Sequence, residues 1–287
     1  MKIAVYGSRR QDGHLQEIEA FMRRLADRDI EVVMHPKIYK YLRGVMLPAL
    51  SAVRRVTDNS DFTADAAVSI GGDGTFLRTA MWTGENNIPI LGVNTGHLGY
   101  LTAIGVNELA DVPDLLTGDR LQHDRRGLIE VVAPELTVWP YALNEVTVSK
   151  NDNASMINAR TTLDGTQLAD YKADGLIVAT PTGSTAYNLS VGGPIIQPRT
   201  PVWVISPIAA HTLSMRPLIV SDRSEISIKP EARAEHFRLT LDGRSVSLPE
   251  GTEIVLRKAR FEIDVLQLEG ASFIETLRNK LHWGQEQ

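Results

Sequence analysis

The chain of 287 residues contains no cysteine. Disulfide bonds, thiolate metal sites and cysteine nucleophiles are therefore excluded. No uninterrupted apolar run approaches the ~20 residues that a membrane-spanning helix needs. Residues 1–6 have the pattern of a strand and lack the layout of a signal peptide. We therefore expect a soluble, cytoplasmic protein with no membrane partner.

Several signatures of known site chemistry are missing as well. The sequence has no G-x-x-x-x-G-K-[ST] run, which excludes a P-loop kinase. Residues 72–77 meet only part of G-x-G-x-x-G, and no acidic residue follows about twenty positions later, so a Rossmann dehydrogenase is poorly supported. His211 has no second histidine at ligand spacing, and we expect no metal site formed by side chains. The net charge of −5 argues against nucleic acid as the main partner.

The first part of the chain alternates buried strands with amphipathic helices. The pattern predicts strands at 3–6, 30–34, 66–70 and 88–93, and helices at 15–25, 38–46, 75–82 and 106–116. A strand, a helix and a strand at this spacing form a βαβ unit, which implies a parallel sheet. We therefore expect an α/β domain with a Rossmann-like parallel sheet over residues 1–120.

After about residue 120 the helical periodicity nearly disappears. The sequence predicts short strands at 128–133, 141–149, 156–163, 166–171, 175–180, 202–206, 217–220, 236–241, 244–248, 253–258 and 260–268. Asp164-Gly165 and Asp242-Gly243 separate neighbouring runs in the manner of hairpin turns. We therefore expect a second, β-rich domain of the β-sandwich kind over residues 121–269.

The last segment returns to a helical pattern. Phe273, Ile274, Leu277 and Leu281 fall on one face of it. An isolated terminal helix has nothing to bury such a face against. We therefore expect residues 270–287 to pack back on the first domain.

One stretch of the first domain joins a buried strand to a helix through glycines. Gly71, Gly72 and Gly74 follow the apolar residues 66–70, and a helical pattern begins at once. Glycines let the backbone approach an anion, and a helix N-terminus supplies positive potential. A polyphosphate would repel the carboxylate of Asp73, which therefore indicates a residue that binds magnesium or takes a proton. On this motif alone, an aspartate that caps the next helix is an equal alternative.

Two polar stretches interrupt the strands of the second domain. Asn144-Glu145 lies inside an otherwise apolar strand, where an ordinary outward-facing pair is the simpler interpretation. Residues 174–194 form a buried strand followed by a loop rich in hydroxyl residues and glycines, with Tyr187 among them. Hydroxyls, an amide and a ring suit the ribose, phosphate and base of a nucleotide. The alternative is a polar turn with one core tyrosine.

Together these motifs resemble those of the bacterial NAD kinases. The resemblance comprises Gly71–Thr75, Asn144-Glu145, Asp174-Gly175, residues 180–190 and Gly192-Gly193-Pro194, in this order over nearly the whole chain. The G-G-D-G-T element is shared with lipid kinases and phosphofructokinases, whereas the run from Thr180 to Pro194 is close to diagnostic. The resemblance implies a phosphofructokinase-like α/β domain, a β-rich domain, and NAD bound between them. It also implies ATP-dependent phosphorylation of the adenosine ribose 2′-hydroxyl, giving NADP.

The resemblance also implies roles for individual residues. Asp73 would be the general base, with Mg²⁺ held through the phosphates of ATP. Asn144 and Glu145 would hold the ribose and the diphosphate region, and Asp174 would meet the nicotinamide end or the adenosine of another subunit. The residues implied to bind the substrates are Gly72, Asp73, Gly74, Arg78, Asn144, Glu145, Lys172, Asp174, Thr182, Thr185, Ala186, Tyr187, Asn188, Leu189, Ser190 and Arg244. Family members form homodimers or homotetramers with sites completed across an interface.

Three positions depart from the family pattern. Lys172 stands where arginine is frequent, which keeps the charge but loses the bidentate fork. Arg244 replaces a frequent glutamine, which puts that polar contact in doubt. The loop Gly7-Ser8-Arg9-Arg10 differs from the Asn- and Lys-bearing loop of many relatives, although its arginines lie where a parallel sheet usually binds ligands.

Three rival functions remain open from the residues themselves. A kinase acting on a lipid or a sugar is the first, and the acidic charge counts against a lipid. A non-catalytic NAD or NADP sensor would be expected to lose Asp73 or its glycines, which are all present. A structural adaptor leaves both glycine-rich polar loops unexplained.

Overall fold

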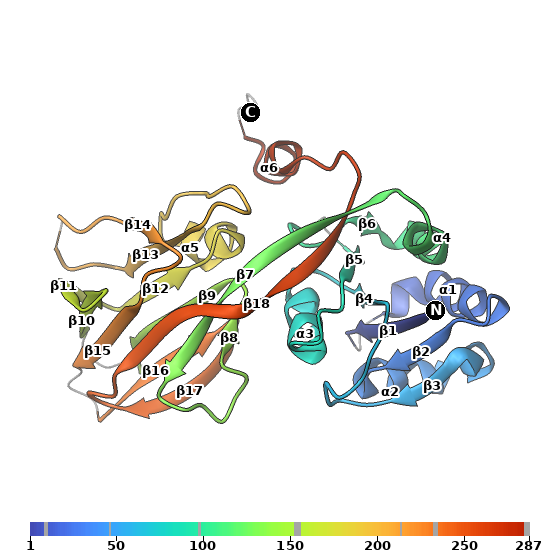
Figure 1. Cartoon of the computed structure of the whole chain (residues 1–287), viewed down its shortest axis with the longest axis horizontal. Coiled ribbons are helices and arrows are strands. Elements are labelled where there is room, and N and C mark those ends of the chain that lie inside the picture. The colour runs from blue at the N-terminus through green and yellow to red at the C-terminus, as the bar shows by residue number, and fades with distance from the viewer. Residues whose placement is uncertain are drawn as a thin grey trace. The chain divides into compact units, whose positions relative to one another are not determined.

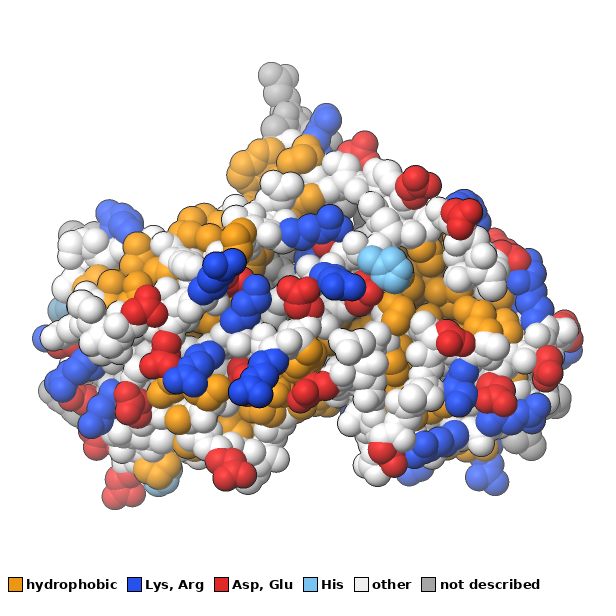
Figure 2. Space-filling view, viewed as in Figure 1, with side chains coloured by type: hydrophobic (Ala, Val, Ile, Leu, Met, Phe, Trp, Pro, Cys, Tyr) orange, Lys and Arg blue, Asp and Glu red, His pale blue; other side chains and the backbone are white. Residues whose placement is uncertain are grey.

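The chain divides into two compact units, which are described separately (Figure 1). The computed structural model describes residues 1–8, 11–45, 47–96, 99–151, 156–212, 214–231 and 235–283. The N-terminal unit comprises residues 1–125 and 263–287, and the C-terminal unit comprises residues 126–262. Two long strands, β7 (Leu121–Ala133) and β18 (Ile254–Leu268), contribute residues to both units. Acidic and basic side chains are mixed over the visible face of each unit (Figure 2).

A parallel sheet forms the centre of the N-terminal unit, as the βαβ pattern predicts. Its strands follow the order β5-β4-β1-β2-β3, and the end of β18 pairs in parallel with β5. The strand bounds are β1 Lys2–Gly7, β2 Glu31–Met34, β3 Val53–Val56, β4 Ala66–Ile70, β5 Ile90–Asn94 and β6 Ile104–Gly105. All five residues of β4 and of β5 are buried, because helices cover both faces of such a sheet.

The helices of this unit follow the predicted amphipathic pattern with one exception. They are α1 Leu15–Asp27, α2 Pro36–Val45 and α3 Asp73–Thr83, with 3₁₀ turns at Asp12–His14 and Leu47–Ala52. The predicted helix at 106–116 is a 3₁₀ helix, Val106–Asp111, followed by α4, Val112–Thr117. Pro113 explains the break, because proline lacks the N–H that an α-helix interior requires and fits only a first turn.

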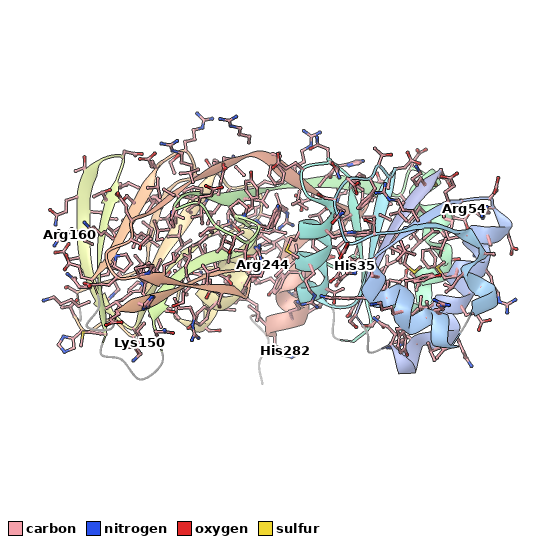
Figure 3. The ribbon with its side chains drawn as sticks, turned by 90° about the horizontal axis from the view of Figure 1, so that it is seen from below. His35, Arg54, Lys150, Arg160, Arg244 and His282 are labelled. Carbon is pink, nitrogen blue, oxygen red and sulfur yellow. The ribbon has the colours of Figure 1, made fainter. Side chains whose placement is uncertain are left out.

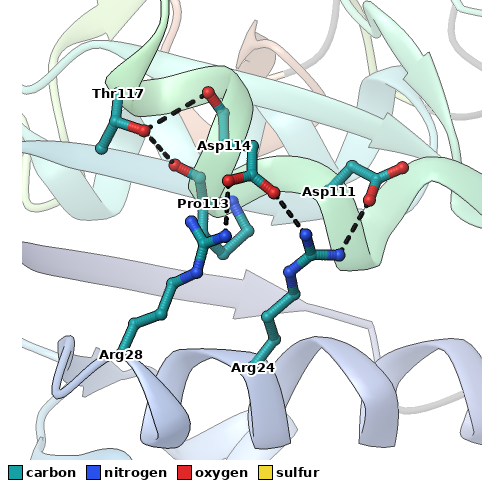
Figure 4. A network of polar contacts seen from close by, with 6 residues as sticks. All are labelled: Arg24, Arg28, Asp111, Pro113, Asp114 and Thr117. Carbon is teal, nitrogen blue, oxygen red and sulfur yellow. Dashed lines mark hydrogen bonds and ion pairs between the residues drawn. The ribbon is translucent and has the colours of Figure 1, made fainter.

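Ion pairs fix α4 and the preceding 3₁₀ helix against α1 (Figure 4). Arg24 pairs with Asp111 at 2.9 Å and also with Asp114, and Arg28 pairs with Asp114 at 2.5 Å. The hydrogen bond from Arg28, together with the charges of both arginines, lowers the pKa of Asp114. All four side chains are solvent-exposed, so this network orients the helices and adds little stability.

Two sheets that share one core form the C-terminal unit, which is the β-sandwich that the sequence predicts. One sheet is antiparallel, in the order β14-β13-β12-β9-β16-β17, and the other holds β11-β10-β15-β18 with β7 and β8 alongside. Buried residues of both sheets, such as Val148 and Leu176 of one and Ile228 and Leu256 of the other, belong to one cluster. The bounds are β8 Tyr141–Ala142, β9 Glu145–Lys150, β10 Ile157–Leu163, β11 Thr166–Ala173, β12 Gly175–Ala179, β13 Val202–Ile208, β14 Leu218–Ser221, β15 Ile226–Glu231, β16 His236–Leu241 and β17 Arg244–Pro249.

Both predicted hairpins are confirmed. β10 pairs with β11 across Asp164-Gly165, and β16 pairs with β17 across Asp242-Gly243. The four turn residues have φ between 45° and 79°, the left-handed conformation of a tight two-residue turn. The predicted runs at 253–258 and 260–268 are wrong as separate strands, because β18 continues through both.

The last helix, α6 (Phe273–Leu281), belongs to the N-terminal unit as predicted. Ser272 caps it by accepting a hydrogen bond from the Glu275 N–H. Its apolar face is only partly covered, since Leu277 is buried but Ile274 is 59% exposed. Lys280, in its last turn, pairs with Asp73 of the same unit.

Candidate functional site

Asp73 lies at the turn between β4 and α3. Gly71, which follows β4, has a φ of +147°, and a Cβ there would lie 2.4 Å from the Thr75 hydroxyl oxygen. Only glycine fits both constraints, so the sharp turn depends on it. Gly72 and Gly74 flank Asp73 at the exposed start of the helix, and Arg78, further along the helix, donates a hydrogen bond to the Thr75 hydroxyl.

The carboxylate of Asp73 does not cap its own helix. It reaches the loop that follows β5, where Oδ2 accepts the Tyr100 N–H at 2.8 Å and Oδ1 accepts the Leu101 N–H at 3.1 Å. A Cβ on Gly99 would lie 1.8 Å from Oδ1, so the loop needs glycine there. An ionised carboxylate offers about four acceptor positions, and the two backbone bonds leave others for a hydroxyl proton.

A lysine from the end of the chain completes the surroundings of Asp73. Lys280 Nζ lies 3.7 Å from Oδ2 and 3.9 Å from the centre of the Tyr100 ring. A pocket of about 520 Å³ is lined by Asp73, Gly99, Tyr100 and residues 279–282. Burial lowers the pKa of Lys280, and the adjacent Asp73 acts in the opposite direction. Sequence reasoning missed Lys280, because a lysine in the last turn of a helix is unremarkable by itself.

In the C-terminal unit, Asp242 holds Asn144 and Glu145 in place. Its carboxylate accepts the backbone N–H groups of Leu143, Asn144 and Glu145 at 2.7, 2.8 and 3.2 Å. Burial raises the pKa of Asp242, and the three N–H donors and Arg244 oppose that shift. The hairpin turn therefore supplies the acceptor that fixes the start of β9.

Asn144 and Glu145 each have a buried side-chain oxygen. Asn144 Oδ1 and Glu145 Oε2 lack hydrogen-bond partners among the described residues. Burial and the neighbouring Asp242 raise the pKa of Glu145 to about 8, against a hydrogen bond from the Tyr187 backbone that lowers it. Buried polar atoms without partners are costly. The carboxyl of Glu145 is protonated below about pH 8, so these two groups suit a ligand with hydroxyl groups, which both donate and accept hydrogen bonds.

The loop after β12 is tied to the same pair. The Thr180 N–H donates to the Asn144 carbonyl at 2.9 Å, and the Thr180 hydroxyl donates to the Leu143 carbonyl at 2.6 Å. A Cβ on Gly183 would lie 2.1 Å from the Asn144 carbonyl oxygen. Asn144, Glu145 and the loop 180–190 therefore form one rigid polar corner within the unit.

Some side chains of this loop are buried and hold it in place, whereas others face outward. Asn188 is fully buried; its amide donates to the Ser184 and Pro194 carbonyls, and its oxygen accepts the Ser206 hydroxyl. Thr182 is buried and accepts a hydrogen bond from Arg126. Tyr187 is 45% exposed and Ser190 is exposed, while Thr185, Ala186 and Leu189 are partly covered. The outward-facing members are those open to a ligand.

Three predicted residues lie apart from this corner or have other partners. Figure 3 labels one of them, Arg244, and also Lys150, the partner of Asp174. Asp174 precedes β12, at the opposite end from Thr180, and pairs with Lys150 at 2.8 Å. Six residues of strand span about 20 Å, so the unit does not bring Asp174 or the exposed Lys172 to the corner. Arg244 donates to the Trp139 and Tyr141 carbonyls at 2.7 and 2.6 Å and covers the Trp139 ring. Arg9, Arg10 and the loop residues His97 and Leu98 are outside the described residues.

The raised pKa of Glu145 predicts a pH dependence of stability. The folded carboxyl titrates at about 8 and the unfolded one near 4.5, so the folded chain holds a proton that the unfolded chain has released. The contribution of Glu145 to the free energy of unfolding is therefore fully present below pH 4.5. It is lost as the pH rises to 8, by about 1.4 kcal/mol per pH unit between the two pKa values.

Urea unfolding of the wild type and of Glu145→Gln at pH 5.5 and 7.5 measures this slope. The glutamine variant, which cannot titrate at this position, is expected to lack this fall in the free energy of unfolding between the two pH values. Equal slopes in the two proteins would show that Glu145 stays ionised in the fold.

Two family models match the chain. The ATP-NAD kinase N-terminal domain matches residues 9–120, and the ATP-NAD kinase C-terminal domain matches residues 143–268. The chain belongs to the NAD kinase family. It is therefore a phosphotransferase of the ATP–NAD kinase type, as its motifs predict.

Individual relatives agree over the full length. The NAD kinase of Bacteroides fragilis is 37% identical, over 100% of this chain and 99% of the relative. That of Porphyromonas gingivalis is 41% identical, over 99% and 98%. An NAD kinase from Archaeoglobus fulgidus, solved in complex with ATP, is 27% identical with a TM-score of 0.74 and covers 98% of each chain. Yeast NADH kinase, solved with NADH, has a TM-score of 0.88 over 100% of this chain and 89% of its own, and its 24% identity supports the fold alone.

Proposed function

We propose that the chain transfers the γ-phosphoryl group of ATP to the 2′-hydroxyl of the adenosine ribose of NAD, giving NADP and ADP, with Asp73 as the general base. The observation that carries the proposal is the Asp73 carboxylate, held by two backbone N–H groups at a glycine turn and at the start of a helix. A helix N-terminus favours the negative charge of a phosphate. A carboxylate fixed at that point is placed to meet a hydroxyl group that attacks the phosphate.

The proton and the phosphoryl group move in opposite directions in this mechanism. A ribose hydroxyl is a weak nucleophile with a pKa far above 7, so it needs a base within hydrogen-bond reach. Asp73 takes the hydroxyl proton as the O2′–phosphorus bond forms and the bond from phosphorus to the oxygen of ADP breaks. Asn144 Oδ1 accepts a hydrogen bond from one hydroxyl group of NAD, the protonated carboxyl of Glu145 exchanges a hydrogen bond with another, and the exposed ring of Tyr187 stacks on a base.

Magnesium enters the proposal through ATP. Within the described residues no group of three or more histidine and acidic side chains is placed to hold a metal ion. Mg²⁺ keeps several waters and is commonly bound through substrate phosphates with one or two carboxylates, so the described donors fit an ion carried by ATP. When bound, the ion neutralises charge on the phosphates.

A product assay tests the function directly. The purified chain, incubated with ATP, Mg²⁺ and NAD, is expected to form NADP, measured by an NADP-specific dehydrogenase cycling assay. Parallel incubations with a diacylglycerol and with a hexose test the rival kinases. Nucleotide binding without NADP formation would contradict the proposal and favour a sensor.

A further part of the proposal concerns the oligomeric state of the enzyme. We infer assembly into a homodimer or homotetramer, since Asp174 lies away from the polar corner of its own unit, where its partly exposed pair with Lys150 suits a contact with another subunit's ligand. Among the described residues no helix is long and apolar enough to cross a membrane.

A further inference from the structure

The last turn of α6 brings a cation to the proposed catalytic centre. Lys280 is the one cation paired with Asp73 in the part of the chain that the structure describes, at 3.7 Å. Its side chain is only 19% exposed. The titratable groups in contact with it are Asp73 from the start of α3 and Tyr100 from the loop after β5, and His282, which follows α6, lines the same pocket. A lysine that was merely solvated would not be held among them.

Tyr100 links the cation to the carboxylate. Its backbone N–H donates to Asp73 Oδ2, and its ring lies 3.9 Å from Lys280 Nζ. A cation over an aromatic face is attracted by the ring quadrupole, more strongly when partly desolvated. The three residues therefore form a closed triangle in which the ring fixes the ammonium and the ammonium faces the carboxylate.

We propose that Lys280 is a positioning residue for phosphoryl transfer, whose ammonium, seated on the Tyr100 ring, holds the Asp73 carboxylate oriented toward the hydroxyl group. The proposal rests on the proposed role of Asp73 as the base. The two backbone N–H groups fix where the carboxylate lies, and the ammonium gives Oδ2 a charged partner that holds the carboxylate in this orientation.

A double-mutant cycle distinguishes action through Asp73 from direct contact with substrate. Lys280→Met keeps the apolar stem and removes the charge. If Lys280 acts through Asp73, Lys280→Met is expected to lower kcat by about 10- to 100-fold in the wild-type background. It should leave the KM values for NAD and ATP within about 2-fold and add no further loss in an Asp73→Asn background. For the slow variants, the rate of NADP formation is measured in single-turnover reactions followed over hours.

Two matched variants control for structure. Lys280→Arg keeps a cation able to lie over the Tyr100 ring and is expected to recover most of the lost kcat. Arg278→Met removes an exposed charge from the same helix turn and is expected to leave kcat unchanged. Thermal unfolding of all variants shows whether α6 stays docked.

The possible results separate this inference from the proposed function. A wild-type kcat in Lys280→Met, or a rise in KM with kcat unchanged, would overturn the role of Lys280 alone. An equal loss in both backgrounds would show that Lys280 acts on substrate and not through Asp73, which also overturns it. Undiminished turnover in Asp73→Asn would instead remove the base from the proposed mechanism.

Discussion

Asp73→Asn is expected to lower the turnover number for NADP formation by about 100- to 10,000-fold, the usual contribution of a general base. An amide has no acceptor that takes a proton at neutral pH. NAD affinity should change little, because the buried polar groups assigned to NAD lie on Asn144 and Glu145. Steady-state kinetics and calorimetric titration with NAD measure the two quantities separately.

The structure also predicts a stability cost for this variant. Both carboxylate oxygens accept backbone N–H groups, and asparagine has only one oxygen. Its amide N–H₂ must face either the Tyr100 or the Leu101 N–H, so one donor loses its partner, at about 1–3 kcal/mol. Asp29→Asn, the same chemical change at an exposed position with φ 52°, is the control and should be neutral. Turnover within 10-fold of wild type would contradict the role as base.

Asp242→Ala is expected to destabilise the C-terminal unit by about 3–5 kcal/mol and to abolish NAD binding. The substitution leaves the N–H groups of Leu143, Asn144 and Glu145 without their acceptor. An unsatisfied buried donor costs about 1–3 kcal/mol, and loss of the desolvated carboxylate offsets part of the sum. Urea unfolding and calorimetric titration with NAD are the measurements.

The other Asp-Gly hairpin provides a matched control. Asp164 has a φ of 50°, close to the 45° of Asp242, but among the described residues its carboxylate accepts only two exposed hydrogen bonds, from the Ser224 hydroxyl and the Glu225 N–H. Asp164→Ala therefore imposes the same backbone strain and is expected to cost about 1 kcal/mol. If the two alanine variants lost equal stability, the turn conformation and not the buried hydrogen bonds would explain the effect.

Local patterns predicted most elements of the fold. The apolar spacing of 15–25 predicts one face made of Leu15, Ile18, Phe21, Met22 and Leu25, of which the last four are buried and Leu15 is partly covered. The strand β15 was missed because Lys229-Pro230 interrupts its pattern, although Pro230 pairs with Ala159 inside a sheet. The short strand β3 was missed because Arg54 and Arg55 are polar and exposed. Both strands exist because neighbouring strands supply partners, which a local pattern does not record.

The sequence by itself determined the family motifs, the two kinds of domain, both Asp-Gly turns and the glycine turn that carries Asp73. These depend on residue types at short spacing, where the local backbone conformation suffices. Only the tertiary structure decided what each side chain meets. It showed that Asp73 binds the Tyr100 loop instead of capping α3, and that Asn188 holds its own loop. It also placed Lys280 beside Asp73, because the order of strands in a sheet and the docking of a last helix bring distant residues together.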